Sequence, residues 1–166
     1  DEAKLAAQAR AIATSPTWPC TVSTLFRETN LGCRRAVSEA ISWFFQQEPM
    51  GIVLEDDCLP HPSFFRFCGE LLRRYEDDER VFQISGNNFQ SGIRRNDRSY
   101  YFSRYNHIWG WASWRRAWDR YDESLVKWPA AKAQRLLHHV GNGSTPFESH
   151  WERIIQSVYD GRVDSW

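Results

Sequence analysis

The chain has 166 residues, which is enough for one domain with a substantial hydrophobic core. Its 21 basic and 21 acidic residues balance, so the composition lacks the basic excess expected of a protein that binds nucleic acid. No apolar stretch reaches the roughly 20 residues of a membrane span. The four cysteines lack metal-binding spacing and indicate buried free thiols. Because free thiols are typical of a reducing compartment, we expect a cytoplasmic protein, free or at the inner face of a membrane.

The first half of the chain alternates between helical and strand patterns. Helical patterns cover residues 2–13, 34–47 and 64–75. Short apolar or alternating runs are typical of strands and occur at 20–26, 52–54 and 81–84. Strands that alternate with helices of this length predict βαβ units. We therefore expect an α/β fold, a three-layer α-β-α sandwich around a mostly parallel, Rossmann-like sheet.

The second half of the chain is rich in aromatic residues. A polar loop over residues 91–98 precedes an aromatic strand at 100–102, and a polar Gly-rich loop at 141–144 separates two later helices. Between these loops we expect a helix with one aromatic stripe made of Trp111, Trp114, Trp118 and Tyr121. This spacing is typical of core packing for Trp114 and Trp118.

Three consecutive carboxylates, Glu55, Asp56 and Asp57, follow the apolar run 51–54. In the predicted sheet they stand at the carboxyl end of a strand, where open sheets bind ligands. A divalent cation relieves the repulsion among clustered carboxylates, and Mg²⁺ is usually held by one or two carboxylates together with substrate phosphates. The position predicts a metal–diphosphate site, although the same residues also suit a turn or the first turn of a helix.

Four blocks of the sequence together resemble GT-A-fold glycosyltransferases. They are 51–57 with 62–65, 30–32, 84–88 and 109–114, and the closest likeness is to bacterial glycosyltransferase-2-like proteins and the N-acetylglucosaminyltransferase I type. The resemblance covers nearly the whole chain. It implies a metal-dependent hexosyl- or N-acetylhexosaminyltransferase of carbohydrate biosynthesis, with a DXD-like motif. Such an enzyme moves a sugar from a nucleotide-diphosphate donor to a hydroxyl of a saccharide or other acceptor, with inversion.

The resemblance also implies roles for individual residues. Asp57 would be the ligand of Mn²⁺ or Mg²⁺. The donor would contact Asn30, Gly32, Arg35, Glu55 and Asp56. The acceptor side would comprise Asn88, Trp109, Gly110 and Trp111, and an exposed ring is expected at Trp109 or Trp111 because these residues flank a glycine.

The catalytic base is harder to place on this chain. In the similar proteins a carboxylate that deprotonates the acceptor follows the Gly-Trp block, in a Trp-Asp setting that best fits a position just after Trp166. Within the chain the candidates are Asp164 and Glu148, with Glu152 as a third. We expect residues 1–166 to be one domain that is incomplete at both ends, without the first nucleotide-binding strand and the C-terminal part, and inactive alone.

Two other functions compete with the glycosyltransferase. A phosphoryl-transfer or hydrolytic domain would also use Asp56 and Asp57, but it would need a nucleophile or a second metal-binding cluster, and neither is visible. A non-catalytic carbohydrate-binding module would use exposed tryptophans as stacking platforms. The module predicts saccharide binding without metal or nucleotide.

Overall fold

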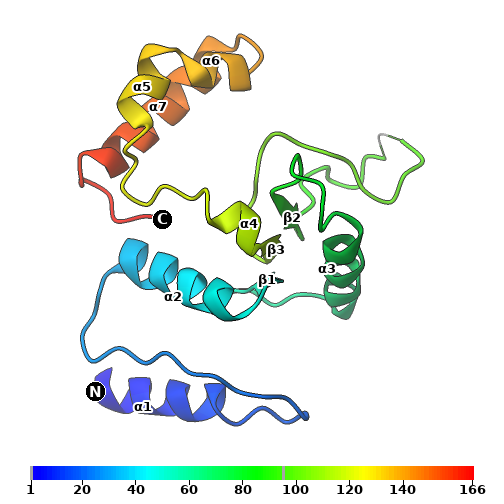
Figure 1. Ribbon diagram of the computed structural model, residues 1–166, viewed down its shortest axis with the longest axis vertical. Coiled ribbons are helices and arrows are strands. Elements are labelled where there is room, and N and C mark those ends of the chain that lie inside the picture. The colour runs from blue at the N-terminus through cyan, green and yellow to red at the C-terminus, as the bar shows by residue number, and fades with distance from the viewer. Residues whose placement is uncertain (1, 95) are drawn as a thin grey trace. The chain divides into compact units, whose positions relative to one another are not determined.

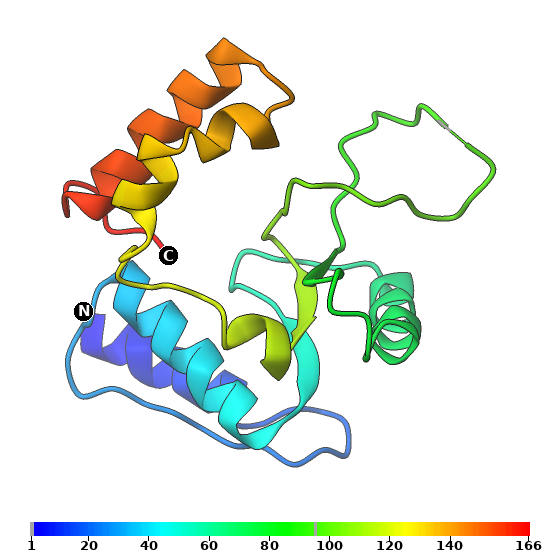
Figure 2. The same cartoon turned by 45° about the horizontal axis from the view of Figure 1, so that its top comes forward.

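The computed structural model describes residues 2–94 and 96–166, shown in two views in Figures 1 and 2. The residues group into two compact units, Asp1–Leu31 and Gly32–Trp166. In the first unit the predicted helix is confirmed as α1 (Glu2–Ala13), none of whose residues is buried. Residues 20–26 do not form the predicted strand. The guanidinium of Arg10 lies 4.9 Å from the ring centroid of Phe26 and connects this irregular segment to α1.

The second unit contains all the strands of the described residues and most of their helices. In chain order these are α2 (Cys33–Gln47), β1 (Met50–Val53), α3 (Pro62–Arg74), β2 (Gln83–Ser85), β3 (Trp111–Trp114), α4 (Arg115–Trp118), α5 (Trp128–Ala133), α6 (Leu136–Val140) and α7 (Thr145–Tyr159). Helices α2 and α3 agree with the periodicity of the sequence, because each buries residues at helical spacing along one face. No helix of the described residues is both long enough and apolar enough to cross a membrane.

The sheet corrects the predicted fold class. Its three strands lie in the order β1-β3-β2, and both pairs are antiparallel. Over the described residues the protein is 43% helical with only this small sheet, so the prediction of a mostly parallel, Rossmann-like α-β-α sandwich is wrong. The prediction rested on βαβ units, in which the strands before and after a helix belong to one parallel sheet. Instead β3 lies between them and runs opposite to both, with Trp111 opposite Val53 on one side and Ser85 on the other.

The central strand β3 also corrects the predicted aromatic helix. All four residues of Trp111–Trp114 are buried, and only the short α4 after them is helical. Successive side chains of a strand point to opposite faces, so Trp111 packs with Ile41 and Phe45 of α2, whereas Trp114 packs with α3. The predicted strand at 100–102 does not form either.

The larger hydrophobic cluster lies between α3 and the sheet. It comprises Cys68, Leu71, Leu72, Ile84, Ala112 and Trp114. The predicted burial of Trp114 is confirmed, and its indole Nε1 donates a hydrogen bond of 3.0 Å to the carbonyl of Leu72. The guanidinium of Arg116 stacks 4.4 Å from the Trp114 ring centroid and donates to three carbonyls, those of Tyr75, Glu76 and Val81.

The four cysteines are free thiols, as predicted, but they differ in burial. Cys68 is fully buried, and burial raises the pKa of its thiol to about 11. Cys20 and Cys33 are exposed and Cys58 is partly buried, so the expectation that the thiols are buried is wrong for the exposed pair.

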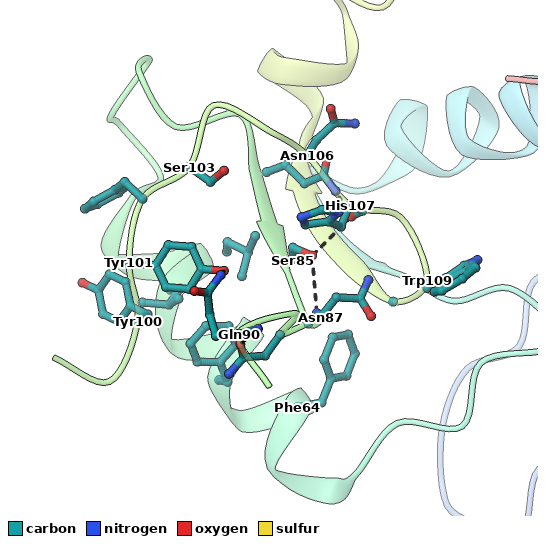
Figure 3. Close-up of a pocket in the computed structure, with 18 of the residues that line it drawn as sticks. Phe64, Ser85, Asn87, Gln90, Tyr100, Tyr101, Ser103, Asn106, His107 and Trp109 are labelled. Atoms are coloured by element: carbon teal, nitrogen blue, oxygen red, sulfur yellow. Dashed lines mark hydrogen bonds between the residues drawn. The ribbon is translucent and has the colours of Figure 1, made fainter. Parts of the chain in front are cut away.

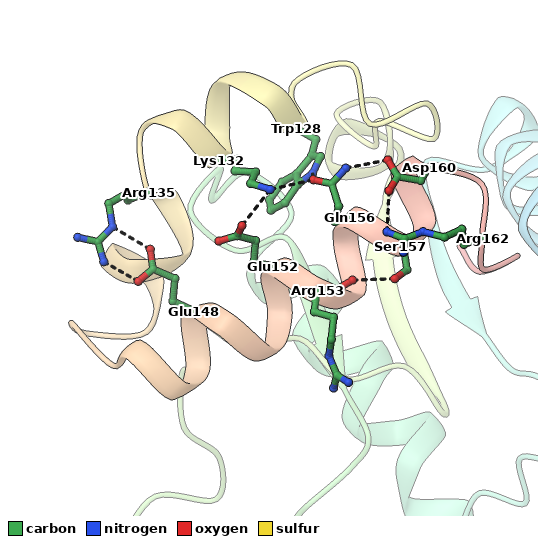
Figure 4. A network of polar contacts seen from close by, with 10 residues as sticks. All are labelled: Trp128, Lys132, Arg135, Glu148, Glu152, Arg153, Gln156, Ser157, Asp160 and Arg162. Carbon is green, nitrogen blue, oxygen red and sulfur yellow. Dashed lines mark hydrogen bonds and ion pairs between the residues drawn. The ribbon is translucent and has the colours of Figure 1, made fainter.

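The helices α5, α6 and α7 are held together by polar contacts, which Figure 4 shows. The indole Nε1 of Trp128 donates to Gln156 at 3.1 Å, and Lys132 forms an ion pair of 2.9 Å with Glu152. Ser144 caps the start of α7, because its hydroxyl accepts a hydrogen bond from the backbone N–H of Phe147. The two helices predicted on either side of the loop 141–144 are thus confirmed as α6 and α7.

Candidate functional site

The acidic residues 55–57 form a turn directly after β1. The backbone N–H of Cys58 donates to the carbonyl of Glu55 at 3.1 Å and closes this turn. Asp56 and Asp57 are exposed, while Glu55 is half-buried. Helix α3 starts shortly afterwards, with the Nδ1 of His61 accepting a hydrogen bond from the N–H of Ser63. We call residues 55–57 the acidic turn.

One residue of the acidic turn, Asp57, lines a cavity of about 1600 Å³. We call it the first cavity, and Figure 3 shows other residues of its lining. Four residues predicted for metal and acceptor binding line it, namely Asp57, Asn88, Trp109 and Gly110. The structure therefore brings together side chains that lie more than 50 positions apart in the sequence.

Two glycines shape the wall of the first cavity. Gly110 has φ +84°, a backbone conformation that residues with a side chain rarely adopt. The N–H of Gly86 donates to the carbonyl of Gly110 at 3.0 Å, and a Cβ at Gly86 would lie 2.4 Å from the ring of Phe64. Because Gly86 has no side chain, the loop after β2 can lie directly against the ring of Phe64 in α3.

The charges around the first cavity are mostly positive. Among the described residues that line it, the basic side chains other than histidine are Arg80, Arg94, Arg98 and Arg104, and the only carboxylate is Asp57. Arg80 is paired with Asp78 at 2.8 Å, and Arg104 donates to the side chain of Asn142 at 2.7 Å. Arg94 lies 3.9 Å from the carboxylate of Asp97, so aspartates outside the lining partly offset two of the four arginines. Arg98 and Arg104 are the arginines of the lining that could attract an anion.

The acidic turn contains a buried carboxylate oxygen without a protein partner. The Oε1 atom of Glu55 is buried and has no hydrogen-bond partner. Over residues 2–94 and 96–166, no three side chains of His, Cys, Asp or Glu gather to hold a metal by themselves. A cation held by one or two carboxylates and completed by substrate phosphates needs no such group. Of these carboxylates only the exposed one of Asp57 lines the first cavity, and it fits a cation of this kind; Glu55 lies outside the lining.

The residues predicted to bind the donor around the start of α2 do not line the first cavity. Asn30 belongs to the first compact unit, whereas Gly32 and Arg35 belong to the second. The Nε of Arg35 lies 2.6 Å from the carboxylate of Glu39 in an exposed i,i+4 pair. Asp56, at the acidic turn, is exposed but is not part of the cavity lining either.

The candidate base Asp164 contacts the start of α2. Its carboxylate accepts hydrogen bonds from the backbone N–H groups of Cys33, at 2.6 Å, and Arg34, at 3.1 Å. These groups have no partner within the helix, so Asp164 acts as a helix cap from a distant part of the chain. A Cβ at position 32 would lie 2.5 Å from an oxygen of Asp164, so the carboxylate can approach this closely only because residue 32 is a glycine.

The candidate base Glu148 is engaged in an ion pair. Arg135 donates to both of its carboxylate oxygens, at 2.9 and 2.7 Å, and the Nδ1 of His138 lies 3.1 Å from one of them. The hydrogen bond from Arg135, followed by that from His138, holds the pKa of Glu148 below its ordinary value. Neither Glu148 nor Asp164 lines the first cavity.

Trp111 differs from Trp109 in exposure. The ring of Trp109 is 59% exposed and lines the first cavity, in agreement with the expectation of an exposed ring beside Gly110. Trp111 is buried in β3, and its ring stacks on Trp166 with centroids 6.0 Å apart. Its ring is therefore part of the core and not a surface platform.

Sequence reasoning missed several residues of the first cavity. His107 and Asn87 line it, and so do Arg80 and Arg104, to which no role was assigned, together with Arg94 and Arg98 of the predicted polar loop 91–98. The side chain of Asn87 donates to the carbonyl of Ile108 at 2.7 Å, which joins the loop after β2 to the loop before β3. No local pattern indicates such contacts, because they depend on the position of β3 between β1 and β2.

No family model matches the chain, and no curated protein or solved structure matches it.

Proposed function

We propose that the intact protein is a metal-dependent glycosyltransferase, which transfers a sugar from a nucleotide-diphosphate sugar to an acceptor hydroxyl with inversion. The observation that carries the proposal is the position of Asp57. It is the one carboxylate among the described lining residues of a cavity that also contains four arginines, Trp109 and Gly110.

The charge distribution supports a nucleotide diphosphate as the ligand. Guanidinium groups favour phosphate oxygens, with which they form charge-assisted hydrogen bonds. A carboxylate would repel the same phosphates, so its presence in a basic cavity needs a reason. A Mn²⁺ or Mg²⁺ ion between Asp57 and the diphosphate would supply one, since it removes the repulsion and would stabilise the negative charge of the leaving diphosphate.

The residues of the chain contribute binding and orientation. Asp57 would hold the cation in the turn after β1, whose position the strand fixes, and the half-buried Glu55 would support that turn without contacting the cation. The exposed ring of Trp109 would stack on a sugar face, and Asn88 would offer amide hydrogen bonds to hydroxyl groups. The base is assigned to neither Asp164 nor Glu148, because both carboxylates are engaged elsewhere.

The test is a calorimetric titration of UDP and of GDP into the intact protein, with and without Mn²⁺. We expect binding that depends on the metal and weakens at least tenfold in Asp57→Asn, a loss of about 1.4 kcal/mol. Asp77→Asn is the matched control, because Asp77 is an exposed carboxylate outside the cavity. Binding that is equal in both variants and independent of Mn²⁺ would contradict the proposal.

A non-catalytic carbohydrate-binding module is the second candidate, and the exposed ring of Trp109 favours it. This function predicts saccharide binding that needs neither metal nor nucleotide and is lost in Trp109→Ala. The absence of nucleotide binding in the first experiment, combined with metal-free saccharide binding, would establish this candidate instead.

A further inference from the structure

A second cavity, of about 530 Å³, adjoins the first. Four residues line both cavities, and Figure 3 labels each of them: Asn87, Asn106, His107 and Trp109. A ligand whose polar end lies at this shared wall can therefore extend into the second cavity.

One wall of the second cavity is an apolar stripe of α7. It comprises Trp151, Ile154, Ile155 and Val158, which follow the i, i+3, i+4, i+7 spacing of a single helix face. Trp151 is 41% exposed and Ile154 is 36% exposed, so neither is covered by the protein to the extent expected of a core residue. Phe89 and Trp166 add further apolar surface to the lining. A gathering of exposed large apolar side chains around a cavity indicates a binding surface.

Two of the charged groups of the second cavity are engaged with the backbone. The guanidinium of Arg34 donates to the carbonyl of Glu123 and, at 3.4 Å, to that of Val158. The carboxylate of Asp122 accepts a hydrogen bond of 3.0 Å from the backbone N–H of Lys127. The first cavity, with its four arginines, is the better place for a charged ligand. The third charged residue of the lining, Glu123, is exposed, and most of the remaining lining is apolar. The apolar part of the second cavity is suited to a neutral, largely apolar group.

We infer that the second cavity binds the apolar aglycone of the acceptor, so that the acceptor is a glycoside with an aliphatic or aromatic substituent and not a free sugar. The inference rests on the proposed function. The sugar of the acceptor lies at the shared wall beside Trp109, next to the donor in the first cavity. Its aglycone lies against the stripe of α7.

The test uses methyl, butyl and octyl β-glucosides, below their micellar concentrations, titrated calorimetrically into the intact protein. Burial of each methylene strengthens binding by up to about fourfold, so we expect octyl glucoside to bind at least tenfold more tightly than methyl glucoside. Ile154→Asp should abolish this dependence on chain length. Ser149→Asp, which adds the same charge to an exposed position of α7 outside the cavity, should preserve it.

The controls separate this inference from the proposed function. Ile154 is partly exposed, so its replacement should leave the far-ultraviolet circular dichroism and the metal-dependent nucleotide binding unchanged. Equal affinity for the three glucosides, in a protein that binds nucleotide, would overturn the inference alone. Glucoside binding that depends on alkyl chain length, in a protein that binds no nucleotide, would support the apolar binding site but reject the proposed transferase function. A dimer that dissociates in Ile154→Asp, with no glucoside binding, would show that a second copy covers the stripe.

Discussion

The α3–sheet region and the α5–α7 region of the second unit are stabilised in different ways. Between α3 and the sheet, six buried apolar residues form one contiguous cluster. In α5–α7, the buried residues include only one large apolar side chain, Trp128, together with the charged Glu148. Ion pairs and side-chain hydrogen bonds connect these three helices (Figure 4). The α3–sheet region should therefore respond mainly to changes in side-chain volume, and α5–α7 to changes in charge and pH.

The largest effect is expected from removal of a central side chain of the α3–sheet region. Trp114→Ala should lower the free energy of unfolding by about 3–5 kcal/mol, the usual cost of deleting a buried aromatic ring. The variant also leaves the carbonyl of Leu72 without its donor. Trp151→Ala, which removes the same side chain at a 41% exposed position, is the matched control. Equal losses in the two variants, measured by urea denaturation, would reject a core centred on Trp114.

A moderate effect is expected when acid protonates Glu148. Because the pKa of Glu148 is lowered in the folded protein, its ionised form stabilises the fold above about pH 4.3, the ordinary pKa of a glutamate. This contribution is lost as the pH falls through the lower pKa of the folded state. As the pH falls below about 4.3, amide hydrogen exchange of α7 should therefore accelerate in the native protein. In Glu148→Gln the same fall in pH should accelerate the exchange much less. Glu152→Gln, which changes a more exposed ion pair, is the control.

The smallest effect is expected from an ion pair on the surface of α3. Arg66 and Glu70 lie 2.8 Å apart, but their side chains are 84% and 60% exposed. Exposed pairs of this kind contribute little, because water and salt screen them. Arg66→Ala should leave the urea midpoint unchanged within error, whereas Arg135→Ala should lower it, since Glu148 would then be buried without its main partner. A larger shift in Arg66→Ala than in Arg135→Ala would reverse the comparison.

The helices show how much of this fold the sequence predicts. Residues 64–75 repeat apolar side chains at helical spacing, and α3 buries that face as expected. The strand β3 shows what could not be predicted. Its tryptophans at 111 and 114 suit one helix face as well as the two faces of a buried strand, and periodicity alone does not separate short runs of either kind. Because β3 pairs antiparallel with both other strands, the failure to predict this one strand made the predicted sheet wrong as a whole.

The candidate site could be predicted only in part for a related reason. The acidic turn depends on its own strand and lies where the sequence placed it, at the end of β1. The contact of Asp164 with the start of α2 joins residues 130 or more positions apart, and the arginines of the first cavity come from irregular loops. Their positions depend on tertiary packing, which a local pattern does not contain.

The strand order also has a consequence for synthesis of the chain. Both β1 and β2 pair with β3, which is the last strand of the sheet in the sequence. During synthesis on a ribosome, the edges of β1 and β2 would stay unpaired while roughly 30 to 60 further residues are synthesised, until β3 emerges. At elongation rates of about 5–20 residues per second, this interval lasts seconds. Nascent chains that stop before residue 111 are therefore the species that should need a chaperone most.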